Sequence, residues 1–192
     1  MTKRIAFFTA AAFGALALTA TVIAPVSAQD KMKSEMSGEK TVMVGGAAMF
    51  PSKNIIQNAV NSKDHTTLVA AVKAAGLVET LEGKGPFTVF APTNAAFGKL
   101  PAGTVDTLVK PENKATLTKI LTYHVVPGKL EASDLTDGKK LKTAAGEELT
   151  VKHQDGKIWI IDAKGGSSMV TISNVNQSNG VIHVVDTVLM PS

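Results

Sequence analysis

The stretch TVFAPTNAAF, residues 88–97, predicts a strand that passes directly into a helix. The segment from Pro86 to Pro92 is apolar and lies between two prolines, which is typical of a short buried strand that the second proline ends. Thr93 or Asn94 follows at once, and either side chain can accept a hydrogen bond from the free N–H groups of a short helix. Both phenylalanines of this stretch are expected in the core because of their large apolar area.

Apolar residues recur at helical spacing on both sides of this stretch. Apolar side chains share one face in residues 54–60, and again in a helix that Asp64 or Thr66 can cap and Gly76 can end. A third helix begins near Pro111, since proline suits the first helical position. Its apolar face is expected to contain Ala115, Leu117, Ile120 and Leu121.

After residue 128 the spacing of apolar residues changes from helical to alternating. Asp155-Gly156 and Asn179-Gly180 predict hairpin turns, because both central positions of the favoured turn need positive φ. Helices first and antiparallel strands afterwards predict the α+β class, with one layer packed on the other. The expected strands are residues 148–153, 157–163, 169–175 and 181–190.

The segment VIHVVDTVLMP, residues 181–191, is apolar on both faces, as expected for a central strand. His183 and Asp186 lie three positions apart on it and are expected on opposite faces, where they cannot share a metal ion. We expect Asp186 to be a buried carboxylate held by backbone N–H groups or a hydroxyl, since buried charges persist only when paired.

The N-terminus predicts an exported protein. Lys3 and Arg4 precede an apolar run over residues 5–24, and residues 26–28, Val-Ser-Ala, are the small residues that cleavage requires. We interpret residues 1–28 as a signal peptide that is removed; the alternative is a retained anchor, since a run of about 20 residues can span a bilayer. Cleavage would leave the mature chain in the periplasm or outside the cell.

Residues 29–49 are polar and then glycine-rich, which is typical of a mobile leader before a domain at residues 50–192. Methionines spaced through this leader could bind Cu(I) by thioether ligation, but neither His nor Cys accompanies them. We therefore favour a leader without a metal. The methionines are Met32, Met36, Met43 and Met49.

Composition and motifs exclude several classes of function. The absence of cysteine excludes disulfides, thiolate metal sites and cysteine nucleophiles. Loss of Lys3 and Arg4 from the 20 basic residues leaves 18 against 16 acidic ones, and none of the 18 is arginine. Because the net charge is small and aromatic residues make up only 5% of the chain, nucleic-acid binding is not expected. The sequence has no nucleophile elbow, phosphate loop or metalloprotease motif, so we predict neither an enzyme nor a cofactor.

Three segments together resemble the fasciclin (FAS1) family. Residues 88–97 resemble its first signature box, residues 181–191 resemble its second, and LTYHVVPG, residues 121–128, resembles the Tyr-His segment between them. Their order, over roughly residues 54–191, makes the match more specific than any single motif. The resemblance implies a FAS1 fold, in which helices pack on an antiparallel β-wedge, and this agrees with the α+β pattern.

The resemblance also implies a secreted, non-enzymatic module of cell adhesion or matrix interaction. Its partner would be a protein or a cell-surface or matrix component, and the mature chain would be a monomer outside the membrane. An alternative is a periplasmic binding or stress protein for a small apolar ligand or copper, which an apolar pocket with few polar groups would favour. A third hypothesis, a hydrolase, needs a Ser or Asp within hydrogen-bond reach of a His in a cleft.

Tyr123 and His124 are the candidate binding residues, because the resemblance links the Tyr-His segment to integrin binding in animal members. The competing interpretation is structural, since His124 extends the helical spacing of the apolar residues before it. We favour the structural interpretation for His124 and leave both open for Tyr123. Adjacent residues point in different directions, so at most one of the two is expected to be fully buried.

Overall fold

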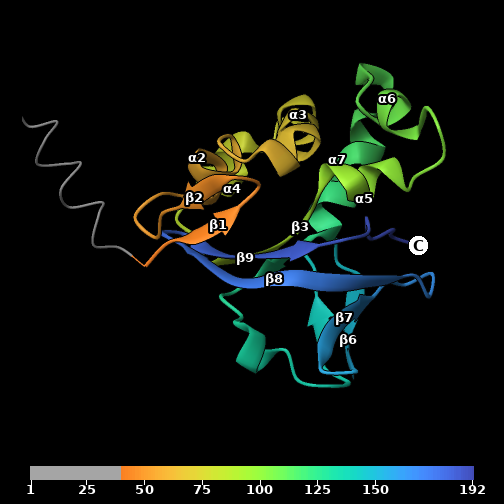
Figure 1. Ribbon diagram of the computed structural model, residues 1–192. Coiled ribbons are helices and arrows are strands. Elements are labelled where there is room, and N and C mark those ends of the chain that lie inside the picture. Colours follow the sequence, from red (N-terminus) through yellow and green to blue (C-terminus); the bar gives the residue numbers. More distant parts are fainter. Residues whose placement is uncertain (1–39) are drawn as a thin grey trace, which may run out of the picture.

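The computed structural model describes residues 40–192 of the chain. Within them, the short helices lie on one side of the long strands β8 and β9, and strands β6 and β7 lie on the opposite side (Figure 1). The expected signal peptide, residues 1–28, and the leader up to residue 39 lie outside the described residues.

Helices dominate the first part of the fold and strands the second. The helices are α2 (Ile55–Ala59), α3 (Thr66–Ala75), α4 (Val78–Glu82), α5 (Asn94–Gly98), α6 (Thr104–Leu108) and α7 (Lys114–Tyr123), with 3₁₀ turns η1 (Lys63–His65), η2 (Pro111–Asn113) and η3 (Ala132–Asp134). The strands are β1 (Val42–Val44), β2 (Ala47–Met49), β3 (Phe87–Pro92), β4 (Val125–Pro127), β5 (Lys140–Lys142), β6 (Glu148–Gln154), β7 (Lys157–Ile161), β8 (Ser167–Gln177) and β9 (Gly180–Val185).

Seven strands form one sheet in the order β4-β3-β9-β8-β7-β6-β5, and β1 pairs only with β2. Neighbouring strands are antiparallel except β3 and β9, which run parallel with Phe90 opposite His183. The α+β prediction is confirmed, with this parallel pair inside the antiparallel wedge. The strands of the first and second signature boxes, β3 and β9, are thus neighbours in the sheet, second and third from its β4 edge, although they lie far apart in the sequence.

Strands β3 and β9, which have a neighbour on each side, are buried on both faces, as the apolar run of β9 predicts. One face packs against the helices through residues such as Val89 and Ile182. The other face carries Phe90 and Val185 into a second cluster, between β3, β9 and the strands β5 to β7. Because side chains alternate along a strand, the same two strands supply both clusters and join the helical layer to the rest of the sheet.

The helix expected in the second half of the first signature box begins as predicted, and of its two candidate caps Thr93 is the one used. Thr93 accepts a hydrogen bond from the Ala96 N–H at 3.2 Å and caps α5. The Asn94 side chain instead accepts from the Thr67 N–H at 3.0 Å and so serves the first turn of α3. This one short segment therefore fixes β3, α5 and α3 relative to one another.

One of the two predicted hairpin turns is shifted. Asp155 and Gly156 have positive φ values of 53° and 71°, as the turn between β6 and β7 requires. In the second hairpin, however, Gln177 pairs with Gly180, so the prediction of a turn centred on Asn179-Gly180 is wrong. Gly180 is the first residue of β9, where a Cβ would lie 2.0 Å from the Phe87 carbonyl oxygen. Close packing against β3 therefore requires the glycine there.

Residues 42–49, which we expected in the leader, are instead an ordered β1–β2 hairpin. Val44 and Met49 are each only 3% exposed and belong to the helical core cluster. Gly45 and Gly46 form the turn with positive φ. The short alternation of apolar residues on either side of a Gly-Gly pair is the signal that predicts such a hairpin.

Candidate functional site

Tyr123 ends α7 inside the second core cluster and is fully buried. Its hydroxyl accepts a hydrogen bond from the Ala163 N–H at 2.8 Å and donates one to the Glu148 carbonyl at 3.3 Å. Burial raises the pKa of Tyr123, and the hydrogen bond from Ala163 opposes this shift. The ring thus ties α7 to β6 and to the loop after β7.

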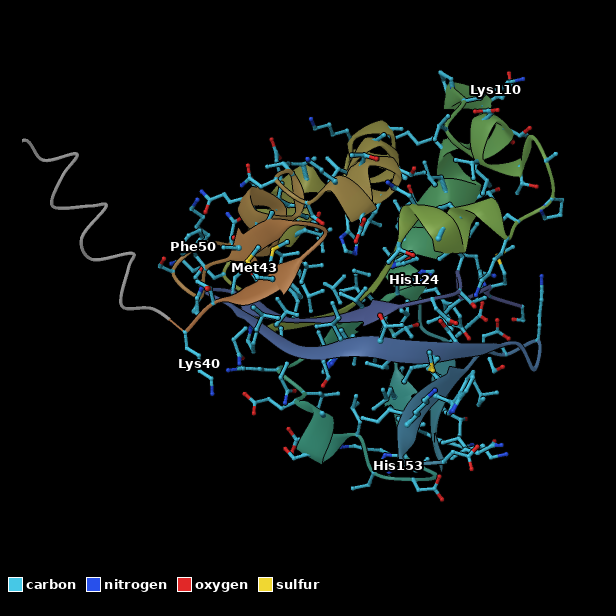
Figure 2. The ribbon with its side chains drawn as sticks, in the orientation of Figure 1. Lys40, Met43, Phe50, Lys110, His124 and His153 are labelled. Atoms are coloured by element: carbon cyan, nitrogen blue, oxygen red, sulfur yellow. The ribbon has the colours of Figure 1, made fainter. Side chains whose placement is uncertain are left out.

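His124 is the C-cap of α7 and lies between the helical layer and the sheet (Figure 2). Its Nε2 accepts a hydrogen bond from the Leu189 N–H at 2.9 Å, so Nε2 carries no proton. The proton is on Nδ1, which donates to the Ile120 carbonyl at 2.8 Å. Burial lowers the pKa of His124 to about 4, although the Ile120 carbonyl and Asp162 oppose the shift. The ring is therefore neutral at physiological pH.

Both members of the Tyr-His pair are buried, with exposed fractions of 0% for Tyr123 and 2% for His124. The expectation that at most one would be fully buried is wrong. The pair lies where α7 ends and β4 begins, so one ring enters the second core cluster while the other faces the helical layer. Neither ring is presented on the surface, and this placement supports the structural interpretation of both residues.

The residues of the second box, His183 and Asp186, are also satisfied within the fold. His183 is buried, stacks on Phe90 and donates from Nε2 to the Leu130 carbonyl at 2.8 Å. Asp186 follows the end of β9 and is partly exposed rather than buried. As expected, its carboxylate accepts hydrogen bonds from a backbone N–H, that of Met169 at 2.9 Å, and from a hydroxyl, that of Thr187 at 3.0 Å. The Lys99 ammonium forms an ion pair with the same carboxylate at 3.2 Å.

No group of three or more His, Asp or Glu side chains is placed to hold a metal ion within residues 40–192. Met32 and Met36 lie outside the described residues. Met43 is 59% exposed on β1, whereas Met49 on β2 is buried in the core. These two thioethers therefore face different environments and do not form a common copper site.

Ser62 and His65 make a buried contact that the sequence analysis did not single out. The Ser62 hydroxyl lies 2.9 Å from His65 Nδ1 and 3.2 Å from the Val44 carbonyl of the hairpin. The hydroxyl has a single proton, which either goes to the Val44 carbonyl while Nδ1 donates to the hydroxyl, or goes to Nδ1 while the ring carries its proton on Nε2 towards the Ala91 carbonyl. Burial lowers the pKa of His65, opposed by the Ala91 carbonyl and Asp64, so the neutral ring is favoured.

This Ser-His contact does not have the geometry of a hydrolase. A nucleophilic serine needs a base that is free to take its proton and a third group that orients the base. Here the Ser62 hydroxyl also contacts the Val44 carbonyl, and within the described residues no carboxylate is hydrogen-bonded to the His65 ring to orient it. Ser62 is also 1% exposed beneath the hairpin, where a substrate cannot approach its hydroxyl.

His65 lines an apolar cavity of about 40 Å³ between the β1–β2 hairpin, the helices and strands β3 and β9. His65 and His124 are the two polar side chains of its lining, and both nitrogens of His124 are already hydrogen-bonded. Much of the wall consists of Ile56, Leu68, Val72, Leu81, Leu121 and Ile182. A lining of this kind would favour the small-ligand hypothesis, but the volume of about 40 Å³ is well below the roughly 150 Å³ of an apolar cavity that takes up benzene.

Sequence reasoning missed this site because its residues come from segments that only the fold brings together. Ser62 and His65 precede α3, whereas Val44 belongs to a segment interpreted as a leader. The Ser-x-x-His spacing at the start of a helix was the available signal. It identifies neither the hairpin above it nor the cavity beside it.

Comparison with known proteins agrees with this architecture. The family model of the fasciclin domain matches residues 63–191. The chain is 52% identical over 153 residues to the protein sll1483 of Synechocystis sp., covering 80% of this chain and 82% of that relative. It is 39% identical over 153 residues to the cell surface glycolipoprotein MPB83 of Mycobacterium bovis, covering 77% of this chain and 64% of that protein.

A solved structure shows the same fold. The FAS1 domain pair of the insect cell adhesion molecule fasciclin I superposes with a TM-score of 0.65 at 19% identity, covering 73% of this chain and 52% of that chain. Among residues 40–192, no helix combines the length and the apolar character needed to cross a membrane. The family model, the relatives and the structural match agree with the two signature boxes, whose strands pair in the sheet, and the chain belongs to the fasciclin domain family.

Proposed function

We propose that this chain is an exported, non-enzymatic interaction module that acts in adhesion at the cell surface or to an extracellular matrix. The observation that carries the proposal is the fasciclin domain over residues 63–191. A relative that is 39% identical is named a cell surface glycolipoprotein, and the fold match is a cell adhesion molecule. The partner is a protein or a cell-surface or matrix component.

The polar side chains that suggested chemistry support a module without catalysis. Tyr123, His124 and His183 hold backbone groups inside the domain, and the Ser62 hydroxyl contacts a backbone carbonyl. Each of these groups has a structural task that a reaction would disrupt.

Export is the first part of this proposal to test. The apolar N-terminus and the Val-Ser-Ala sequence at residues 26–28 predict a mature protein that begins at Gln29. Mass spectrometry of the protein from the periplasm and the culture medium measures its N-terminus. Intact Met1 on exported protein would contradict cleavage.

Adhesion is tested with fluorescent beads that carry the mature chain, residues 29–192, and with beads that carry albumin. We expect cells of the source organism to retain the first kind of bead, and soluble mature chain to compete for retention. Equal retention of both kinds of bead, or retention that soluble chain does not reduce, would refute an adhesive role.

A further inference from the structure

We propose that the outer face of strands β5 to β8 is a contact for an acidic polysaccharide, a chain of sugar rings that carry carboxylate groups. One ring would stack on Trp159, and its carboxylate would pair with Lys152. The inference rests on the proposed adhesive function, because it names the chemistry of the matrix component. Binding of a purified polysaccharide can be measured without cells, so the two can fail separately.

The register of the sheet places one aromatic ring beside lysines on a single face. Lys152 of β6 lies opposite Trp159 of β7, and Trp159 lies opposite Met169 of β8. Residues paired across strands share a face, and so do residues two positions apart on one strand. Lys157 and Ile161 therefore share the face of Trp159, which we call the outer face. The opposite face of these strands supplies the second core cluster.

Trp159 is the single tryptophan of the chain, and core packing does not explain it. Its side chain is half-buried and belongs to neither core cluster, and the same holds for Ile161 and Met169 on the outer face. The indole Nε1 has no hydrogen-bond acceptor among residues 40–192, so no polar contact there fixes the ring. A large ring that serves neither cluster is available for recognition, which is a frequent use of tryptophan at interfaces.

A groove of about 230 Å³ opens on the outer face beside this ring. The flat C–H face of a sugar can pack on the indole and on Ile161. Its hydroxyls can form hydrogen bonds with Gln154 and Ser167, and a carboxylate can pair with Lys152. The groove is smaller than the roughly 300–1,000 Å³ of pockets for drug-sized ligands, so it suits one ring of a chain that continues along the surface.

The charge of the outer face selects an acidic partner. Lys140 and Lys142 of β5 lie opposite β6 residues of this face, and with Lys152 and Lys157 they make four exposed lysines. Strands β5 to β8 contain one acidic residue, Glu148, which forms an ion pair with Lys140 at 3.3 Å. The other three ammonium groups have no ion pair or hydrogen bond within the described part of the chain. The face is thus more positive than the expected mature chain as a whole, which has 18 basic and 16 acidic residues.

Protection of the sheet edge accounts for only part of this charge. Lysines on an edge strand discourage pairing with another chain, and β5 is an edge strand of the sheet. Strands β6 and β7 have a neighbour on each side, so Lys152 and Lys157 protect no edge. An anionic partner that lies across the face explains the positive charge over these interior strands.

Two other anionic partners fit this face less well. A bilayer surface is bound by apolar side chains that enter it, whereas the apolar side chains of the outer face are half-buried. The exposed large apolar side chains of the described structure, Met43 and Val60, lie elsewhere. A peptide docks on a sheet chiefly through backbone hydrogen bonds at an edge, whereas the groove lies over interior strands whose backbones already pair with neighbours.

Tryptophan fluorescence tests the face directly, because Trp159 is the only residue of its kind in the chain. The mature chain is titrated with polygalacturonate and with the same polymer after methyl esterification, which keeps the rings and removes their charge. We expect polygalacturonate to change the emission, to bind at least about fivefold more tightly than the ester, and to bind less tightly as salt is added. Unchanged emission, or equal affinity for both polymers, would overturn the proposal.

Two more titrations decide between the classes of partner. Polyglutamate represents an acidic peptide, and vesicles of phosphatidylglycerol represent an anionic membrane. We expect both to bind more weakly than polygalacturonate. Tighter binding of polyglutamate would assign the face to an acidic peptide, and tighter binding of the vesicles would assign it to a membrane; either result would overturn the polysaccharide.

Lys152→Gln and Lys73→Gln are matched variants, since each removes one exposed positive charge and Lys73 lies on α3 in the helical layer. We expect Lys152→Gln to weaken polygalacturonate binding about threefold more than Lys73→Gln. Equal affinities in the two variants would contradict the assigned contact. Trp159→Leu, measured by calorimetry, should weaken binding at least about fivefold through loss of the stacking surface. If this variant does not fold, the pair of lysine variants decides.

Soluble polygalacturonate added to the bead assay separates this inference from the adhesive function. We expect it to compete with cells for beads that carry the mature chain. If the beads are retained and the polymer does not reduce their retention, adhesion stands and the outer face is not its contact. If the polymer binds the chain in solution but cells do not retain the beads, the site stands and the adhesive function is refuted.

Discussion

Lowering the pH to 5 should destabilise this domain through His124, and the structure gives the size of the effect. In the folded state the pKa of His124 is about 4 because the ring is buried, against 6.5 when unfolded. Between these values the unfolded chain binds a proton that the folded chain does not, so stability falls as the pH falls. The destabilisation is absent well above pH 6.5, grows as the pH falls below 6.5 and levels off below about pH 4.

The magnitude follows from the two pKa values. At about pH 7.5 the ring is neutral in both states, and the free energy of unfolding gains almost nothing from the difference. At about pH 5 the difference removes about 2 kcal/mol from the free energy of unfolding, and the limit at lower pH is about 3 kcal/mol. Protonation would also place a hydrogen on Nε2 facing the Leu189 N–H, which breaks that hydrogen bond.

The assay compares urea unfolding of the wild type and of His124→Gln at both pH values. Glutamine does not titrate, and its side-chain oxygen can replace Nε2 as the acceptor for Leu189. His65 and His183 also have pKa values lowered by burial, and their effect is the same in both proteins. Glu147, whose pKa is about 2 owing chiefly to its hydrogen bond with Lys119, stays ionised throughout.

We expect the wild type to lose about 2 kcal/mol more than His124→Gln between the two pH values. An equal loss in both proteins would refute the assignment of the neutral buried ring. At neutral pH, His124→Ala should lower stability by about 1–3 kcal/mol through lost packing and hydrogen bonds. If His124→Ala melted like the wild type and yet lost partner binding, the pair would be a recognition site after all.

Three further substitutions test the core by chemical unfolding. Phe90→Ala should cost about 3–5 kcal/mol, because the ring is fully buried in the second core cluster; a cost below about 1 kcal/mol would contradict that burial. Tyr123→Phe should cost only about 1 kcal/mol, since exposed Ala163 can donate to water instead, and a larger loss than in His124→Ala would be inconsistent with this. Gly180→Ala should cost more than about 3 kcal/mol through the clash with the Phe87 carbonyl, whereas Gly98→Ala, with open space around its Cβ, should be neutral or slightly stabilising; similar values for both would refute the close approach.

The local elements of this fold could be predicted from sequence because their causes are local. The strand of residues 88–92, the cap at Thr93 and the Asp155-Gly156 turn each depend on a few adjacent side chains and backbone dihedral angles. The apolar run in residues 181–190 also predicted a strand buried on both faces, since such burial needs apolar residues at every position; the strand that forms, β9, ends earlier, at Val185. Together these features were enough to predict the α+β class and the family resemblance.

The pairing of those elements was decided by tertiary structure. Nothing local to β3 and β9 specifies that they run side by side in parallel, because strand pairing depends on where the whole chain places each edge. The same contact explains Gly180, which the sequence suggested as a turn residue and the fold uses to admit the Phe87 carbonyl.

The candidate sites show the same division. Sequence spacing indicated a structural His124, but the burial of both rings follows from a helix that ends between two core clusters. The cavity, the Ser62–His65 contact and the hairpin above them come from separate segments, and a hydrogen bond between segments leaves no periodic pattern in either. Amino-acid patterns determined which segments are buried, and only packing in three dimensions decided which buried groups meet, as Ser62 and His65 do beneath the hairpin.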